Sequence, residues 1–396
     1  MRYSSLTQRI SPDTDQPGRD PWEVHSLALE RLSNGEDVIL LSIGQESDKS
    51  TPSCVVDAAI SSLRNGHHHY TDVAGQTNLR QAVAEYHQHL SGQVVSAQQC
   101  VIYAGAQNAL FAVSQVLLEH GQQVILSEPY YTTYQTTFSA TGSEVVSVPL
   151  RSQSNYELTV SDIESAINDN TQMLVLNSPN NPMGHCYTRK QWQALVNLCV
   201  ERDIWMVHDA VYADIVGMSP EQMPQSLPGA EQVLITVGSL SKSHRMTGWR
   251  LGWAVAPLEL SEHLTNLSMC MHYGLPPFIM DAAVVALEDA KNTPRVIEKL
   301  LNGRRQRLKA HLAKLPVGAV LDSGTGMFLL LDTQKFELSG YEFALGLLNK
   351  HLVSVLPCNG FGATGKHLVR IGLCVDDARL DRAGKAIAEY CHSLKP

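Results

Sequence analysis

The sequence has no long hydrophobic run and no concentrated basic tract. No stretch approaches the roughly 18 consecutive apolar residues that a membrane-spanning helix requires, and the opening MRYSSLTQRI lacks the apolar core of a signal peptide. Charged residues make up only 17% of the chain, and the net charge of -9 argues against nucleic acid as a partner. We therefore expect a soluble cytoplasmic protein that acts on small molecules, with no role for membrane or nucleic acid.

The sequence also lacks the cysteine and histidine spacings typical of disulfide and metal sites. No C-x-x-C pair occurs among the eight cysteines, so neither a disulfide framework nor a zinc ribbon is indicated, and a reducing compartment fits. His67, His68 and His69 are consecutive, so their side chains point in different directions and cannot converge on one ion without other ligands. We expect no metal and assign these histidines to a loop.

Enough apolar sequence is present for two domains. The 396 residues are 44% apolar, and strand-like runs alternate with helical patterns from about residue 45 to 280. This alternation predicts an α/β fold with a mostly parallel sheet covered on both faces. The basic stretch 299–314 is interpreted as a solvated helix face. The expected strands are 37–42, 100–104, 124–127, 173–176, 204–207, 233–235, 327–331, 352–356 and 367–373.

The most informative stretch is TVGSLSKSHRMTGWRLGW, residues 236–253. Its composition suits a strand that leads into an anion-lined turn better than a helix interior. We interpret Lys242 as the covalent carrier of pyridoxal phosphate, because this cofactor needs an amine for its aldehyde and hydrogen-bond donors for its phosphate. Ser239 and Arg250 supply a hydroxyl and a bidentate cation. The alternative is an ordinary exposed lysine near a loop.

Three segments carry a family resemblance. Ser239, Ser241, Lys242, Gly248, Arg250 and Gly252 match S-x-S-K followed by G-x-R-x-G, the lysine segment of class I/II aminotransferases. The loop NSPNNPMG at 177–184 is similar to their N-P-x-N-P-x-G segment, and Tyr70, Gly75 and Leu79-Arg80 match Y-x-x-x-x-G-x-x-x-L-R. The chain therefore resembles a fold-type I pyridoxal-phosphate enzyme along nearly its whole length.

Several residues are expected to bind the cofactor. Gly105-Ala106-Gln107 forms a glycine turn at a helix start, where free N–H groups and the positive helix end suit a phosphate. Asp209 at a strand end would keep the ring nitrogen protonated, although a helix cap is the alternative. Tyr212 and Asn181 would hydrogen-bond the ring oxygen, and the resemblance also places Asn181 at the substrate carboxylate.

Two further tyrosines are assigned by the resemblance. Tyr131 matches the aromatic residue that stacks on the pyridine ring, whereas Tyr130 and Tyr134 are assigned to packing only. Tyr70 matches the tyrosine that reaches across a dimer interface to the neighbouring cofactor's phosphate; a capped helix start is the alternative. The resemblance thus implies a homodimer with shared active sites.

Arg370 and Gly44 are the expected substrate-binding residues. Arg370 lies in the apolar strand HLVRIGL, where a charge is costly unless it is paired, so we expect it to face a carboxylate. Many such arginines pair with protein acids, but this one matches the family's arginine for the substrate α-carboxylate. Gly44 matches a glycine that lets the backbone approach this carboxylate, although the following GQES departs from the usual acidic, proline and aromatic neighbours.

The resemblance also implies an architecture and a reaction. We expect a large pyridoxal-phosphate domain at 45–285 with a seven-stranded sheet, an N-terminal arm and part of the small domain at 1–44, and the rest of the small domain at 286–396. The expected reaction moves an amino group from an L-amino acid to a 2-oxo acid in ping-pong fashion. MRYSSLTQRI, SLSKSHRMTGWR and MHYGLPPFIMDAA resemble members that use arginine and pyruvate.

An arginine donor would need a carboxylate partner for its guanidinium. The acidic candidates are Glu46, Asp13, Asp15 and Asp20. Other specificities of the same family (aspartate, aromatic or kynurenine) and a β-lyase or decarboxylase would share the cofactor residues. A transcription regulator would need a further DNA-binding domain, for which about 40 residues before the fold are too few. The non-enzyme alternative is a cofactor-free interaction protein.

Overall fold

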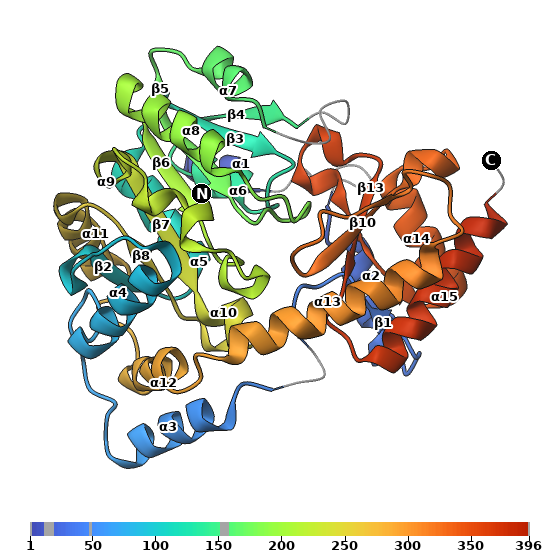
Figure 1. Ribbon diagram of the computed structural model, residues 1–396, viewed down its shortest axis with the longest axis horizontal. Coiled ribbons are helices and arrows are strands. Elements are labelled where there is room, and N and C mark those ends of the chain that lie inside the picture. Colours follow the sequence, from blue (N-terminus) through green and yellow to red (C-terminus); the bar gives the residue numbers. More distant parts are fainter. Residues whose placement is uncertain (1, 12–19, 47–49, 151–157, 395–396) are drawn as a thin grey trace.

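A seven-stranded sheet forms the larger side of the molecule (Figure 1). The computed structural model describes residues 2–11, 20–46, 50–150 and 158–394. The strand order is β2-β8-β7-β6-β5-β3-β4, and all neighbours are parallel except β8, which is antiparallel to both β2 and β7. The predicted α/β fold with a mostly parallel sheet is therefore confirmed. The strands are β2 (Cys100–Tyr103), β3 (Gln123–Glu128), β4 (Glu144–Pro149), β5 (Thr171–Asn177), β6 (Trp205–Asp209), β7 (Leu234–Ser239) and β8 (Gly252–Val255).

Helices cover both faces of this sheet because successive strand residues point in opposite directions. Val124 and Leu126 of β3 pack into one apolar cluster with α5, α6 and α11. Ile125, between them, packs into another cluster with α7 and α8. The helices on this side are α3 (Ser53–Arg64), α4 (Thr77–Ser91), α5 (Ala106–Leu117), α6 (Tyr134–Ser139), α7 (Val160–Ala166), α8 (Arg189–Arg202), α9 (Ala230–Val233), α10 (Leu240–Ser243), α11 (Leu258–Met271) and α12 (Pro277–Glu288).

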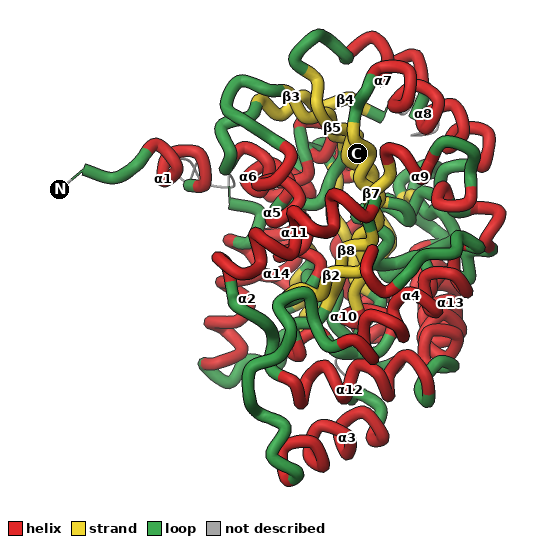
Figure 2. The backbone as a smooth tube through the Cα atoms, turned by 90° about the vertical axis from the view of Figure 1, so that its left-hand side faces the viewer, coloured by secondary structure: helices red, strands yellow, loops and turns green. Residues whose placement is uncertain are grey.

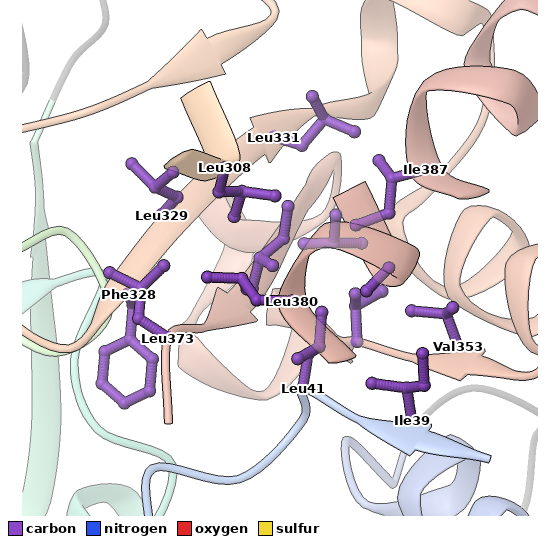
Figure 3. Close-up of a cluster of buried hydrophobic side chains, with 14 of the residues drawn as sticks. Ile39, Leu41, Leu308, Phe328, Leu329, Leu331, Val353, Leu373, Leu380 and Ile387 are labelled. Carbon is purple, nitrogen blue, oxygen red and sulfur yellow. The ribbon is translucent and has the colours of Figure 1, made fainter. Parts of the chain in front are cut away.

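The smaller side combines both ends of the chain. Figure 3 shows its core, where Ile39 and Leu41 from the N-terminal segment pack among residues from the last hundred positions, including Leu380 and Ile387. Two small sheets run β1-β11 and β12-β13-β10-β9. The elements are α2 (Glu23–Ser33), β1 (Ile39–Leu40), α13 (Thr293–Leu312), β9 (Val320–Leu321), β10 (Phe328–Asp332), α14 (Gly340–His351), β11 (Val353–Ser354), β12 (Leu356–Pro357), β13 (Leu368–Gly372) and α15 (Asp377–Ser393).

Three expectations about this smaller side need correction. The strand expected at 37–42 is ladder-paired only at Ile39–Leu40, because the chain bends from residue 42. The strand expected at 352–356 divides into β11 and β12, which belong to different sheets. The basic stretch 299–314 is not simply a solvated face, since Arg304 and Arg305 are 2% and 1% exposed and form buried ion pairs.

The N-terminal helix α1 (Ser5–Ile10) projects from the side of the molecule (Figure 2). It has no buried residue, and its link to the body includes a hydrogen bond from Arg9 Nη2 to Ala140 O of 3.0 Å. None of the helices in the described parts of the chain is long and apolar enough to span a membrane.

Candidate active site

A cavity of about 170 Å³ lies at the C-terminal ends of β5, β6 and β7, beside the start of α5. Parallel strands place the residues that follow them at one edge of a sheet, which is where α/β proteins bind ligands. Nine of the predicted site residues line the cavity: Ala106, Gln107, Tyr131, Asn181, Asp209, Tyr212, Ser239, Lys242 and Arg250. Predicted residues that are far apart in the sequence, from position 106 to position 250, thus line one cavity.

Lys242 lies in α10, the short helix that follows β7. Ser239 caps this helix, with its Oγ accepting a hydrogen bond of 3.0 Å from Ser241 N, so the turn is fixed locally. Lys242 Nζ donates to Gly44 O at 2.7 Å. Burial lowers the pKa of Lys242 to about 8, and the positive charges of Arg370 and Arg250 act in the same direction. At pH 7, about one unit below this pKa, roughly a tenth of the amine is neutral, far more than for an ordinary lysine.

Arg250 and the start of α5 form a cradle suited to a phosphate. Gly105, with φ of 90°, caps α5, and a Cβ on it would lie 2.4 Å from Arg250 Nη2. A Cβ on Gly252 would lie 2.6 Å from Ala106 N, so both glycines permit the close approach. Asn108 N donates to Gly105 O at 3.1 Å, whereas the N–H groups of Ala106 and Gln107, the first two of α5, precede the first intrahelical bond. Arg250 donates to the carbonyls of Thr247 (2.8 Å) and Ala104 (3.3 Å).

Asp209 is 5% exposed at the end of β6. Tyr134 OH donates to its Oδ2, and Val211 N donates to its Oδ1 at 3.2 Å. Burial raises the pKa of Asp209 to about 6, which the hydrogen bond from Tyr134 partly offsets. Tyr134 lines the cavity and contacts the key carboxylate, so its assignment to packing only was wrong.

The loop after β5 places Asn181 between two other site residues. Asn181 Nδ2 donates to Tyr212 OH at 3.2 Å, and its Oδ1 accepts from Arg370 Nη1 at 2.9 Å. Asn177 fixes the loop, because its Oδ1 accepts from Asn181 N (2.7 Å) while its Nδ2 donates to Asp209 O (2.9 Å). No role was predicted for Asn177 from the sequence, although it begins the matched loop segment.

Arg370 is buried on β13, with 2% of its surface exposed. Besides Asn181, it donates to Ser42 O at 2.8 Å, and its guanidinium carbon lies 4.0 Å from the centroid of the Phe328 ring. Its Nε has no hydrogen-bond partner, and no acid of the described chain forms an ion pair with it. The alternative that Arg370 pairs with a protein acid is therefore not seen among the described residues, and the guanidinium is available for an external carboxylate.

The four charged groups of the site share one property. Lys242, Arg250, Arg370 and Asp209 are held by carbonyl, amide or hydroxyl groups, and none forms an ion pair within the described segments. Asp209 and Arg370 are buried, where a charge is costly without an opposite charge, Lys242 is partly buried, and Arg250 is exposed. The arrangement is complementary to an anion at Arg250, a cation at Asp209 and a carboxylate at Arg370.

The remaining predicted residues lie around the cavity or away from it. Gly44 contributes its carbonyl to Lys242, and a Cβ on it would lie 2.6 Å from the Phe328 ring. The amide of Gln107 is engaged by Thr133 (2.7 Å) and Thr137 (2.6 Å). Tyr70 is 89% exposed and packs edge-to-face on Tyr273, outside the cavity, so its role across a dimer interface stays a prediction.

The acidic residues suggested as partners for a substrate guanidinium differ in their surroundings. Glu46 is already paired with Arg304 at 2.9 Å, and its side chain is only 5% exposed. A neutralised, buried carboxylate is not free to bind a second guanidinium, so this hypothesis for Glu46 was wrong. Asp13 and Asp15 lie outside the described residues. Asp20 is partly exposed, and its Oδ1 accepts from Trp22 N at 2.8 Å.

His67 pairs with Asp281 at 3.0 Å, while His68 and His69 contact each other edge-to-face. No group of three or more potential ligands arranged for a metal ion occurs among the residues with described positions.

The site and the sheet define a class of enzyme. The sequence matches aminotransferase class I and II over residues 36–387, and the chain belongs to this family. Arginine–pyruvate transaminase AruH of Pseudomonas aeruginosa is 43% identical over 98% of this chain and 98% of its own. An aspartate aminotransferase of Pyrococcus horikoshii is 30% identical over 93% of this chain and 94% of its own.

Solved structures agree with this assignment. The aspartate aminotransferase of Thermus thermophilus with maleate superimposes with a TM-score of 0.90 at 27% identity, over 98% of this chain and 100% of its own. The aromatic aminotransferase of Pyrococcus horikoshii gives 0.85 at 27% identity, over 92% and 99%. The protein is thus an aminotransferase that acts on amino acids and 2-oxo acids and uses pyridoxal phosphate.

The residues present fit this cofactor. The glycines at 105 and 252 leave room for a phosphate that side chains would fill, beside Arg250 and the free N–H groups of α5. Asp209 lies in the same cavity as Lys242, as a ring nitrogen and an aldehyde of one molecule require. When bound, pyridoxal phosphate supplies an aldehyde that condenses with amines and a ring that accepts electrons.

Proposed function

We propose that the enzyme transfers the α-amino group of L-arginine, or another basic amino acid, to pyruvate. The observation that carries this choice is the 43% identity with arginine–pyruvate transaminase AruH over 98% of both chains, whereas the aspartate-type relatives are 30% identical or less. An aspartate, aromatic or kynurenine specificity would use the same cofactor residues and is the alternative.

We assign the chemistry to the residues described above. Lys242 Nζ would take the proton from the donor's α-carbon and pass it to the cofactor, and it would move a proton in the opposite direction in the second half-reaction, for which an amine with a pKa of about 8 is well placed. Asp209, ionised above its pKa of about 6, keeps the cofactor's ring nitrogen protonated. Arg370 and Asn181 fix the α-carboxylate, and Tyr212 and Asn181 contact the ring oxygen. Gly105, Ala106, Gln107, Ser239 and Arg250 hold the phosphate, and Tyr131 covers the ring.

For the guanidinium of arginine we propose Asp20 as a carboxylate partner. Its neighbour Trp22 packs in a cluster with Phe361 and Tyr131. Tyr131 lines the cavity, and Phe361 lies under the guanidinium of Arg370, 5.4 Å from it. The segment that begins at Asp20 therefore borders the substrate side of the site. The partial exposure of Asp20 leaves its carboxylate accessible to a ligand.

Substitution of Asp20 by asparagine tests this assignment. We expect the KM for arginine to rise at least about tenfold and that for alanine to change little, because only arginine carries the distal charge. The matched control is Asp37→Asn, which removes an exposed carboxylate paired with Arg382 at 2.6 Å. Equal changes in KM for arginine and alanine would remove Asp20 from this role.

We also propose a homodimer with shared active sites. Its support is the exposure of the predicted contact residue Tyr70 and of its neighbour Tyr273, which are 89% and 55% exposed in the single chain. Sedimentation of the purified protein tests the dimer. A Tyr70→Phe variant tests the shared site, and we expect it to bind pyridoxal phosphate less tightly.

The proposed domain division is 1–44, 45–285 and 286–396, with one refinement. The seven-stranded sheet lies inside the second range, and the small sheets come from the other two. Helix α12 continues to Glu288, so we place the second boundary after this residue.

Absorption spectroscopy with added substrates tests the proposed reaction. We expect the visible band of the bound cofactor to disappear on addition of L-arginine and to return on addition of pyruvate, and the Lys242→Ala variant to lack the cycle. A response to aspartate or an aromatic amino acid but not to arginine would discard the arginine specificity. Product formation without a 2-oxo acid would favour a β-lyase or decarboxylase.

A further inference from the structure

The segment Ser42–Glu46 contacts both functional ends of the site. Ser42 O accepts from Arg370 Nη2 at 2.8 Å, and Gly44 O accepts from Lys242 Nζ at 2.7 Å. Two residues further on, the carboxylate of Glu46 accepts from Arg304 Nη1 at 2.9 and 3.1 Å. We call residues 42–46 the strap. Its alternate residues touch the substrate arginine, the catalytic lysine and a buried ion pair.

The strap is held from both ends. At its start, Leu41 packs in the core of the smaller side, and Leu41 O accepts from Gly372 N at 2.7 Å (Figure 3). At its end, Arg304 of α13 is 2% exposed and also contacts Asp377 Oδ1 at 3.3 Å. The ion pair of Arg304 with Glu46 is therefore a buried anchor for the strap. Its arginine lies on α13 and also contacts Asp377 on α15.

Gly44 sits where small displacements matter. A Cβ at this position would lie 2.6 Å from the Phe328 ring, and the same ring carries the guanidinium of Arg370 at 4.0 Å. A shift of the strap would move the Gly44 carbonyl away from Lys242 and disturb the surface on which Arg370 rests. Without the anchor at Glu46, the chain beyond Gly44 loses its charged contact with the smaller side.

We infer that Glu46 and Arg304 are positioning residues, whose buried ion pair holds the strap so that the Gly44 carbonyl receives the Lys242 amine in register with Arg370. In this role the Gly44 carbonyl accepts the hydrogen bond of the Lys242 amine whenever the amine is not joined to the cofactor. The inference rests on the aminotransferase class of the chain and not on arginine as donor.

The first test measures the Lys242 amine without any turnover. The cofactor-free, full-length protein is acylated with an amine reagent across a pH range, and the labelling of Lys242 is followed by peptide mapping. The variants are Glu46→Gln and Arg304→Gln. A carbonyl acceptor stabilises the ammonium form, so its loss should lower the pKa of Lys242 in both variants, by about one unit.

The two variants distinguish two causes of a shift in the pKa of Lys242: displacement of the strap and the through-space effect of the removed charge. Glu46→Gln removes a negative charge and Arg304→Gln a positive one, so a purely Coulombic effect would move the pKa of Lys242 down in the first and up in the second. Opposite shifts would overturn the inference, whereas shifts in the same downward direction support it. If Arg304→Gln does not fold, Arg304→Lys keeps the charge and should still lower the pKa.

The matched control is a neighbouring buried ion pair on the same helix. Arg305 Nη1 pairs with Asp322 Oδ1 at 2.7 Å and also donates to Phe328 O at 3.1 Å, a bond that Asp322→Asn leaves in place. Asp322→Asn should lower the melting temperature but leave the pKa of Lys242, kcat and KM unchanged. In the holoenzyme, Glu46→Gln should lower kcat about tenfold, with a smaller change in KM, since misplacement mainly affects the proton transfer. A Glu46→Gln variant that loses stability alone, as Asp322→Asn does, would reduce the pair to a structural role.

Discussion

Two arginines that are equally buried have opposite surroundings. Arg304 and Arg370 are each 2% exposed. Arg304 contacts the carboxylates of Glu46 and Asp377, whereas Arg370 contacts an amide oxygen, a backbone carbonyl and an aromatic face. A buried cation whose charge is balanced by the chain has no need of a further partner, and one that is left unbalanced is suited to bind an anion from outside. Burial alone therefore does not separate a structural arginine from a binding one; the charge of its partners does.

Replacement of each arginine by methionine should separate the two roles in stability. Arg304→Met leaves Glu46 buried without its cation, and we expect the free energy of unfolding to fall by about 3–5 kcal/mol. Arg370→Met removes an uncompensated buried charge and should leave the stability of the cofactor-free protein unchanged or slightly higher. Denaturant unfolding of both variants provides the measurement. Equal losses would break the comparison.

The two arginines should also differ in their effect on activity, where Arg370 is expected to matter more. Arg370→Met deprives the substrate carboxylate of its partner. This should cost about 2–5 kcal/mol of transition-state stabilisation, so that kcat/KM for the amino donor falls roughly 30- to 5,000-fold. Steady-state kinetics of the full reaction with the donor concentration varied would measure this. Arg370→Lys should recover only part of the loss, because an ammonium cannot form the bidentate contact. A fall of less than about tenfold in Arg370→Met would contradict the assignment.

The phosphate cradle adds a third arginine, Arg250, which is exposed and donates to two backbone carbonyls. Gly105→Ala would place a Cβ 2.4 Å from Arg250 Nη2 at a φ of 90°. This strain, about 1–3 kcal/mol, should weaken cofactor binding roughly 5- to 150-fold. Fluorescence titration with pyridoxal phosphate measures the affinity. The control is Gly248→Ala, whose added Cβ meets no atom within 4 Å, and it should bind normally.

Asp209 provides the smallest expected effect. The Tyr134→Phe variant removes the hydroxyl that lowers the pKa of Asp209, so this pKa should rise above about 6. The ionised carboxylate is lost as pH falls through the pKa, and the acid limb of kcat/KM should therefore move to higher pH, by about one unit. A pH profile of the variant against the parent protein is the measurement. An unchanged acid limb would assign the hydroxyl to packing after all.

The sequence predicted those parts of the site that local motifs carry. Lys242, Asn181, Asp209 and Arg250 lie in segments whose spacing is set by one turn or loop, and all four line one cavity in the structure. Five of the seven strands of the large sheet were equally predictable, because they are buried on both faces and read as apolar runs. The other two were not predicted: β4 is partly exposed, and β8 begins inside the segment interpreted as a turn.

Contacts between distant segments were not predictable in the same way. Glu46 and Arg304 are 258 positions apart, and nothing local to either residue indicates that they meet. The basic composition of the segment around Arg304 was misleading, since a helix face that packs against acids reads like a solvated one. Tyr134 was missed for a similar reason: its partner Asp209 lies 75 positions away, and a tyrosine near other aromatic residues is typical of packing.

The strap has a consequence for how the protein is made. Ser42 and Arg370 are 328 positions apart, yet the hydrogen bond between them spans the two ends of the chain. During synthesis the sheet that carries Lys242 and Asp209 is complete long before β13 leaves the ribosome, while the segment holding Ser42 must wait for it. We expect closure of so long a loop to make the smaller side the later part to fold, so that the residues assigned to the cofactor are in place before Arg370, the residue assigned to the substrate carboxylate.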